Sequence, residues 1–243
     1  MDMKLKAGRI AGAAAPYETP PGAAALARHG APRLWAEFIA LFVLVPLGLA
    51  LFASQSWHLF TTFLICLAIG VALLQVTPGF RWRSQLEGPI APHARASLVF
   101  IAGAAALIAA LVFWLTPASF LMLPMLRPEL MLTIALAYPL VSALPQEILF
   151  RTLFFERYGA LFGAGPAGRW TAIGVNAATF GLAHAFYANW VAVGITALGS
   201  LFFAHAYLDR RSFALAVFWH SVAGVLVFAL GLGRFLFTGA VLP

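Results

Sequence analysis

The sequence predicts an all-α fold, a polytopic transmembrane helical bundle of about seven spans, or eight if a short C-terminal run also crosses. Of the 243 residues, 63% are hydrophobic and only 9% are charged, whereas a soluble domain carries roughly 25% charged residues. The apolar residues gather in runs of about 20, the length that crosses the hydrocarbon core of a bilayer. The 7 tryptophans lie mostly near the ends of these runs, where an aromatic belt meets the membrane surface.

Composition divides the chain into four segments. Residues 1–33 are rich in Ala, Gly and Pro and are expected to form a flexible cytoplasmic tail, 34–129 hold N-terminal transmembrane helices, 130–232 form a transmembrane core, and 233–243 are a short C-terminal segment. The predicted spans are 36–53, 58–77, 97–115, 130–150, 171–187, 190–208 and 212–232. The run 235–242 is too short to cross alone.

Basic residues set the expected orientation. With the N-terminus inside, the inner segments hold 13 Lys and Arg, whereas the outer segments hold only Arg127 and Arg234. This bias follows the positive-inside rule and predicts an integral protein of a bacterial inner membrane with a cytoplasmic N-terminus. It also accounts for the net charge of +7 without a nucleic-acid partner. The single cysteine, Cys66, excludes an intramolecular disulfide and a cysteine-rich metal site.

Glu147 is the one acidic residue that the membrane setting does not explain. The other seven lie in the tail, in a loop or near span ends. A charge at the centre of a span costs about 2.5–3.5 kcal/mol on insertion scales, so a compensating partner is expected. Arg151 follows four residues later, on the same helix face and in the favourable order. The structural alternative is an ion pair that only closes a helix end.

Two histidines lie inside predicted spans, His184 in the fifth and His220 in the seventh. Asn176, Phe180 and His184 are spaced four residues apart and are expected to share one stripe of a helix. A lone histidine in a span is often an interhelical hydrogen-bonding residue. Two histidines together with an unusual Glu–Arg pair favour a functional site.

These residues form three motifs in order. The segment Pro145–Arg151, sequence PQEILFR, resembles the EExxxR motif of the CPBP family of CAAX-protease and bacteriocin-processing intramembrane peptidases. Phe180–His184 is similar to its FxxxH motif, and His220 corresponds to the histidine of its HxxxN motif. The resemblance covers about residues 130–232. It implies an intramembrane endopeptidase that hydrolyses a membrane-associated protein or peptide.

The chain departs from the family pattern twice. Gln146 replaces the first glutamate, which in the family is credited with activating water, and Gly224 replaces the asparagine, which is thought to stabilise the oxyanion. Asn176 is an alternative donor for that oxyanion. The resemblance therefore implies Glu147, His184 and His220 as catalytic residues, with Gln146, Arg151, Asn176 and Phe180 in support.

The expected mechanism needs an activated water and a stabilised oxyanion. In the favoured version Glu147 takes the proton from water, His184 and His220 stabilise the oxyanion, and no metal is used. In the alternative, Glu147, His184 and His220 bind zinc, a ligand set typical of catalytic zinc sites. Competing functions are a non-catalytic scaffold or immunity protein, which the two departures favour, and a small proton-coupled transporter.

The depth of the site in the membrane is the remaining question. At 1.5 Å per residue, Glu147 lies about 6 Å along its helix from Arg151, and His184 about 22 Å from Arg169. Glu147 and His184 meet if span five starts above the inner surface of the membrane or if the connection around Asn189 dips into the membrane. Pro139 and Pro145 are expected to interrupt span four and to shift Glu147.

Overall fold

The all-α prediction is confirmed. A computed structural model describes residues 21–52, 56–88 and 90–236, and this part of the chain contains helices and turns but no strand. Its α-helices are α1 (Pro21–Ile39), α2 (Val45–Phe52), α3 (Ser56–Gln75), α4 (Ala94–Leu115), α5 (Met122–Leu126), α6 (Pro128–Tyr138), α7 (Leu144–Glu147), α8 (Gly165–Leu182), α9 (Trp190–Leu208) and α10 (Phe213–Leu230).

Within the described residues, five helical stretches are long and apolar enough to cross a membrane, and they support an integral membrane protein. They are Gly30–Phe52, Ala94–Leu115, Pro128–Phe162, Trp190–Leu208 and Phe213–Leu230. The two other predicted spans coincide with α3, whose apolar part is the shorter Leu59–Gln75, and with α8. The number of seven crossings therefore stays a prediction.

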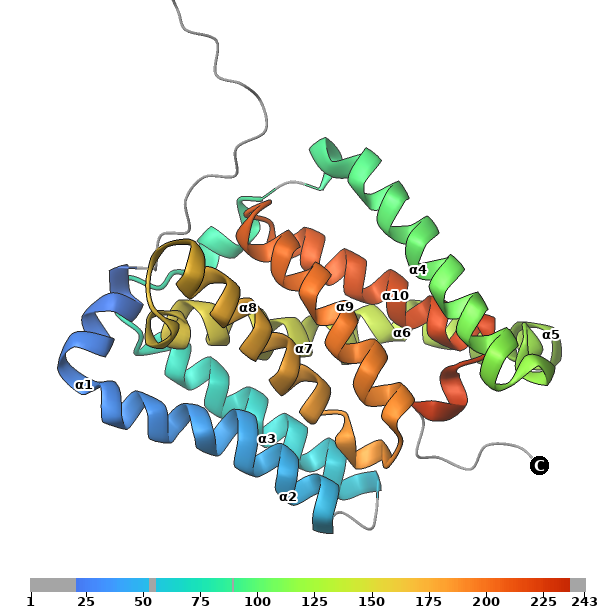
Figure 1. Cartoon of the computed structure of the whole chain (residues 1–243), viewed down its shortest axis with the longest axis horizontal. Coiled ribbons are helices and arrows are strands. Elements are labelled where there is room, and N and C mark those ends of the chain that lie inside the picture. The colour runs from blue at the N-terminus through green and yellow to red at the C-terminus, as the bar shows by residue number, and fades with distance from the viewer. Residues whose placement is uncertain (1–20, 53–55, 89, 237–243) are drawn as a thin grey trace, which may run out of the picture.

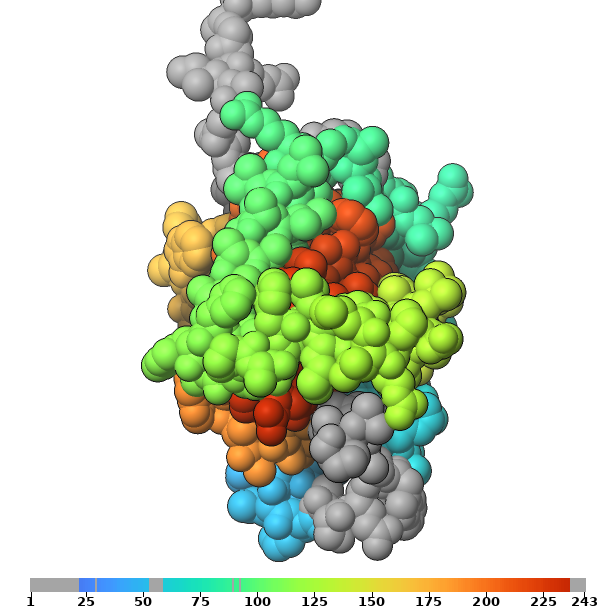
Figure 2. Space-filling model, turned by 90° about the vertical axis from the view of Figure 1, so that its right-hand side faces the viewer, coloured from blue at the N-terminus to red at the C-terminus, as the bar shows by residue number. Residues whose placement is uncertain are grey.

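The C-terminal helices form the centre of the bundle. α8 packs against α9, α9 against α10, and α10 against α4, while α1 and α3 pack against the segment Ile148–Tyr158. Figure 1 shows α1 to α3 along one side of the molecule and α4 crossing obliquely on the other. In Figure 2 atoms of α10 are visible at the bottom of a hollow between α4 and the α5–α6 segment.

The predicted N-terminal tail ends earlier than residue 33. Its residues 1–20 lie outside the described residues, whereas α1 already begins at Pro21. The Ala-rich stretch after Pro21 favours helix because alanine has the highest helix propensity. A kink at Gly30 then redirects the chain into the apolar stretch that follows.

The predicted fourth span, 130–150, is also too short. The helix runs on to Phe162, and π-type wide turns at Pro139–Ala143 and Ile148–Tyr158 replace the expected interruption. Pro139 lacks the N–H that a regular helical bond needs, which gives a physical cause for the first wide turn. Glu147 therefore lies between two widened segments, a feature often found at functional sites.

The long helix buries two arginines that the expected orientation places in inner loops. Arg151 has no exposed surface, and Arg157 is 3% exposed. Arg157 donates from Nε and Nη2 to Oε2 of Glu37 at 2.9 and 2.8 Å, and from Nη1 to the Thr77 hydroxyl at 3.0 Å. These contacts join α1 and the chain just after α3 to the core. They explain how the long helix can continue beyond residue 150 although Arg157 is buried in it.

We expect Arg157→Met to destabilise the bundle without changing the turnover of the molecules that stay folded. Hydrogen bonds to charged groups are worth about 1.5–3 kcal/mol each, and Glu37 would lose its buried partner. The measurement is thermal unfolding in detergent. Arg127→Met, at an exposed position before α6, is the matched control. Equal melting temperatures for the two variants would contradict this role of Arg157.

Candidate active site

The carboxylate of Glu147 is fully buried and binds two partners. Oε1 accepts a hydrogen bond from Nδ1 of His220 at 2.8 Å, and Oε2 lies 3.2 Å from Nε of Arg151. The geometry around Oε2 is that of an ion pair rather than of a hydrogen bond. The charge that the sequence left unexplained is thus compensated by an arginine on its own helix and a histidine on α10.

Arg151 is held from several sides. Nη1 donates to Oδ1 of Asn176 at 3.0 Å and to the Phe150 carbonyl at 3.2 Å, and the guanidinium carbon lies 5.1 Å from the ring centre of Phe180 and 5.5 Å from that of Phe203. Aromatic faces attract cations at such distances. Arg151 is therefore fixed, and it fixes Glu147 in turn.

Asn176 supports Arg151 rather than facing a substrate. Its Oδ1 also accepts from the Ser200 hydroxyl at 3.1 Å, and its Nδ2 donates to the Phe150 carbonyl. The residue has no exposed surface. Because the side chain is closed off from the cavity, the structure gives no support to Asn176 as the oxyanion donor.

His220 links the buried carboxylate of Glu147 to a cavity. Because a carboxylate only accepts, Nδ1 of His220 carries the proton of the bond to Glu147. In the neutral imidazole this leaves Nε2 with a lone pair, and Nε2 lies 3.3 Å from the Tyr138 hydroxyl. The ring stacks on Phe203 with 4.8 Å between centroids and 10° between planes. These contacts fix the imidazole and expose its edge to a cavity.

His184 lies just beyond the end of its helix. α8 ends at Leu182, and His184 begins the tight turn Ala185–Tyr187, which leads to a left-handed Ala188. Asn189 then caps α9 by accepting from the Ala192 N–H at 2.8 Å. His184 therefore lies two residues beyond the end of α8 rather than within the helix, and its place in the fifth span stays a prediction. Nδ1 of His184 donates to the Phe180 carbonyl at 2.8 Å, which leaves its Nε2 without a proton in the neutral ring.

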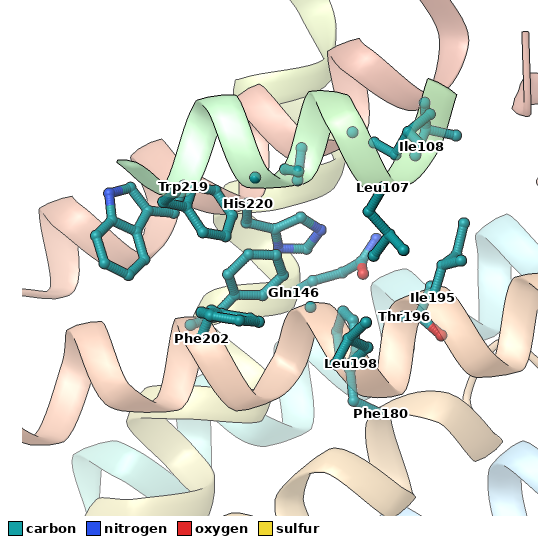
Figure 3. Close-up of a pocket in the computed structure, with 18 of the residues that line it drawn as sticks. Leu107, Ile108, Gln146, Phe180, Ile195, Thr196, Leu198, Phe202, Trp219 and His220 are labelled. Atoms are coloured by element: carbon teal, nitrogen blue, oxygen red, sulfur yellow. The ribbon is translucent and has the colours of Figure 1, made fainter. Parts of the chain in front are cut away.

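A cavity of about 1010 Å³ brings the candidate residues together. Its walls come from α4, α6, α9 and α10, and they include Gln146, His184 and His220. Figure 3 shows Gln146 and His220 pointing into this space, with apolar side chains of α4 and α9 around them. Glu147 is not on the wall, so within this structure it reaches the cavity through His220.

A second cavity, of about 350 Å³, lies on the other side of the site. It is lined mainly by apolar residues of α2, α3 and the long helix. Four residues line both cavities, namely Ser142, Gln146, His184 and Tyr187. Gln146 donates from Nε2 to the Ser142 hydroxyl at 2.9 Å, while its Oε1 is buried without a partner in the described part of the chain.

The residues do not fit the zinc alternative. Among the described residues, no three His, Cys, Asp or Glu side chains come together as a group that could hold a metal ion. Glu147, which the zinc alternative needs as a ligand, uses its oxygens for His220 and Arg151. The predicted ligand set of Glu147, His184 and His220 is therefore not assembled in this structure.

Tyr138 is a site residue that the sequence reasoning missed. It lines the large cavity and contacts Nε2 of His220 from the last turn of α6. A signal existed, because Tyr138, Ser142 and Gln146 are spaced four residues apart and place polar groups along one side of an otherwise apolar span.

The site combines a buried Glu–His pair with a large adjoining cavity in a helical membrane bundle. In a comparison with family models, residues 128–226 match the family described as "Rce1-like: Type II CAAX prenyl endopeptidase Rce1-like". The match confirms the resemblance to the CPBP/CAAX-protease family over the segment that carries all three motifs. The matched segment is thus similar to a family of CAAX-protease-like intramembrane peptidases. Neither the search of curated proteins nor that of solved structures returns a match.

Proposed function

We propose that the chain is an intramembrane endopeptidase that hydrolyses a peptide bond of a membrane-associated protein or peptide at the His220–Glu147 pair. The observation that carries this proposal is the pair itself. A buried carboxylate holds Nδ1 of His220 at 2.8 Å while the same ring lines a cavity of about 1010 Å³. A carboxylate that orients a histidine and stabilises its charged form is a recurrent device for activating a nucleophile.

In the proposed reaction a water in the cavity gives its proton to Nε2 of His220 as its oxygen attacks the carbonyl carbon. Glu147 stabilises the imidazolium that forms, and Arg151 holds Glu147 in place. The sequence analysis predicts that Glu147 itself takes the proton, but its side chain has no exposed surface. Transfer of the water proton to His220, which Glu147 holds in place, therefore fits the geometry better than direct transfer to Glu147.

The other polar groups on the cavity wall have complementary roles. Gln146, on the wall of both cavities, positions the water or the substrate by hydrogen bonding. His184 lies on the wall shared by both cavities, and its Nε2 is assigned to the leaving amine. Collapse of the tetrahedral intermediate breaks the C–N bond and returns the proton to that amine.

A cleavage assay tests the proposal. The purified protein is reconstituted in liposomes with a quenched fluorogenic peptide that ends in a CAAX sequence with a farnesylated cysteine, and with the same peptide without the farnesyl group. The prenylated probe is chosen because the matching family is described as a prenyl endopeptidase. Cleavage of either probe that is lost in His220→Ala supports the proposal. Absence of cleavage of both would favour a non-catalytic family member.

We expect the cleavage rate to withstand metal chelation. Because the candidate zinc ligands do not converge, incubation with 1,10-phenanthroline should change the rate by less than about twofold, whereas removal of a zinc that activates water would abolish turnover. A non-chelating phenanthroline isomer is the control for direct inhibition. Loss of activity with the chelator alone, restored by added zinc, would contradict the metal-free mechanism.

A further inference from the structure

On α10, Gly224 stands where the family pattern has asparagine. The space beside this glycine is filled by a side chain from another helix. Gly224 follows His220 by four residues, on the same face of α10. A Cβ at this position would lie 2.5 Å from the hydroxyl oxygen of Tyr138 and would collide with its ring. The phenol of Tyr138 thus fills the space into which any side chain at position 224 would project.

Tyr138 is fixed in this space by its neighbours. Its ring meets Phe228 edge-on at 6.2 Å and His220 at 6.0 Å between centroids. Both Tyr138 and Gly224 line the large cavity. The hydroxyl is therefore held at the cavity wall by aromatic contacts on α10, and glycine at position 224 is the residue that allows this approach.

The hydroxyl lies where hydrolysis needs a donor. It is 3.3 Å from Nε2 of His220, the nitrogen that accepts the proton of water in the proposed reaction. The attacking oxygen and the oxyanion are bonded to the same carbon in the tetrahedral intermediate, so a base and an oxyanion donor must be neighbours. Tyrosine hydroxyls can serve as such donors.

We infer that Tyr138 is a catalytic residue whose hydroxyl donates a hydrogen bond to the oxyanion from the space left open by Gly224. In the resting site the O–H donates to Nε2 of His220. When substrate binds, it turns to the carbonyl oxygen and leaves Nε2 to the water. This inference rests on the proposed peptidase function and assigns to Tyr138 the donor that neither Gly224 nor Asn176 provides.

The first test is Tyr138→Phe in the liposome cleavage assay. Loss of one oxyanion donor lowers kcat by about 10²–10³-fold, and KM should stay within about twofold because the bond forms only in the transition state. Tyr158→Phe is the matched control. Tyr158 is buried in the same long helix, but its hydroxyl faces Glu37 at 3.5 Å, away from both cavities. A kcat of Tyr138→Phe equal to that of the control overturns the inference.

A second test exchanges one donor for another. Tyr138→Ala removes the ring and makes room for the side chain of Gly224→Asn, whose amide can donate from the same face as His220. We expect the double variant to turn over at least tenfold faster than Tyr138→Ala alone. If the double variant has the same melting temperature as the wild type but turns over no faster than Tyr138→Ala, the inference is contradicted. Wild-type protein that cleaves no probe would instead overturn the proposed function.

Discussion

Replacing Arg151 with leucine is expected to cost about 3–5 kcal/mol of stability, the range found when one partner of a buried ion pair is removed. Arg151 has no exposed surface and contacts Glu147, Asn176 and the Phe150 carbonyl. Without it the carboxylate of Glu147 would keep, among the described residues, only His220 as a polar partner. The measurement is the melting temperature in detergent, compared with that of Arg127→Leu at an exposed position.

A double variant tests whether the stability lost in Arg151→Leu comes from the unpaired charge of Glu147 or from the lost packing of the arginine side chain. Glu147→Gln together with Arg151→Leu removes both charges and leaves no ion unpaired, so it should recover most of the stability that Arg151→Leu loses. It should remain inactive, because the carboxylate is gone. Arg151→Leu that melts within a degree or two of the wild type would show that the pair is not what stabilises Glu147.

Replacing Glu147 with glutamine is expected to lower kcat by about 10²–10⁴-fold, the range associated with general acid–base groups and their carboxylate partners. An amide can donate its N–H to Nδ1 of His220 and so favour the tautomer in which Nε2 carries the proton. That ring could no longer accept a proton from water. Glu129→Gln, at an exposed glutamate in the first turn of α6, is the matched control and should keep wild-type turnover.

The stability of the Glu147→Gln variant must be measured alongside its activity. The substitution leaves Arg151 buried with a neutral partner, so some loss of stability is expected. The rate is therefore compared at a temperature at which both proteins are folded. A folded Glu147→Gln variant with more than a tenth of wild-type kcat would remove Glu147 from the mechanism.

The fold class could be predicted from the sequence, and the main residues of the candidate site could be proposed from it, because each has a local signal. Long apolar runs predict membrane helices, and a charged residue within such a run needs a partner, which Arg151 supplies four residues away. The motifs then identified His184 and His220. His220 contacts Glu147 directly, and His184 lies on the wall of the same cavity.

Other features depend on contacts between distant segments, which no local pattern encodes. The bond between Arg157 and Glu37 spans 120 positions, and this pairing lets the fourth span continue past residue 150. The contact of Tyr138 with His220 spans 82 positions. The sequence shows the glycine at position 224, but it does not show that Tyr138 fills the space beside this glycine. The end of α8 before His184 likewise depends on the turn and cap that start α9.

Hydrolysis at the Glu147–His220 pair is tested most directly by mass spectrometry of the probe peptide after incubation in H₂¹⁸O with wild type and with Glu147→Gln. The wild type should produce two peptides, with ¹⁸O in the new C-terminal carboxylate of one of them, and Glu147→Gln should yield at least a hundredfold less of both in the same time. Intact probe with the wild type, or equal amounts of labelled product from the two proteins, would contradict hydrolysis at this pair.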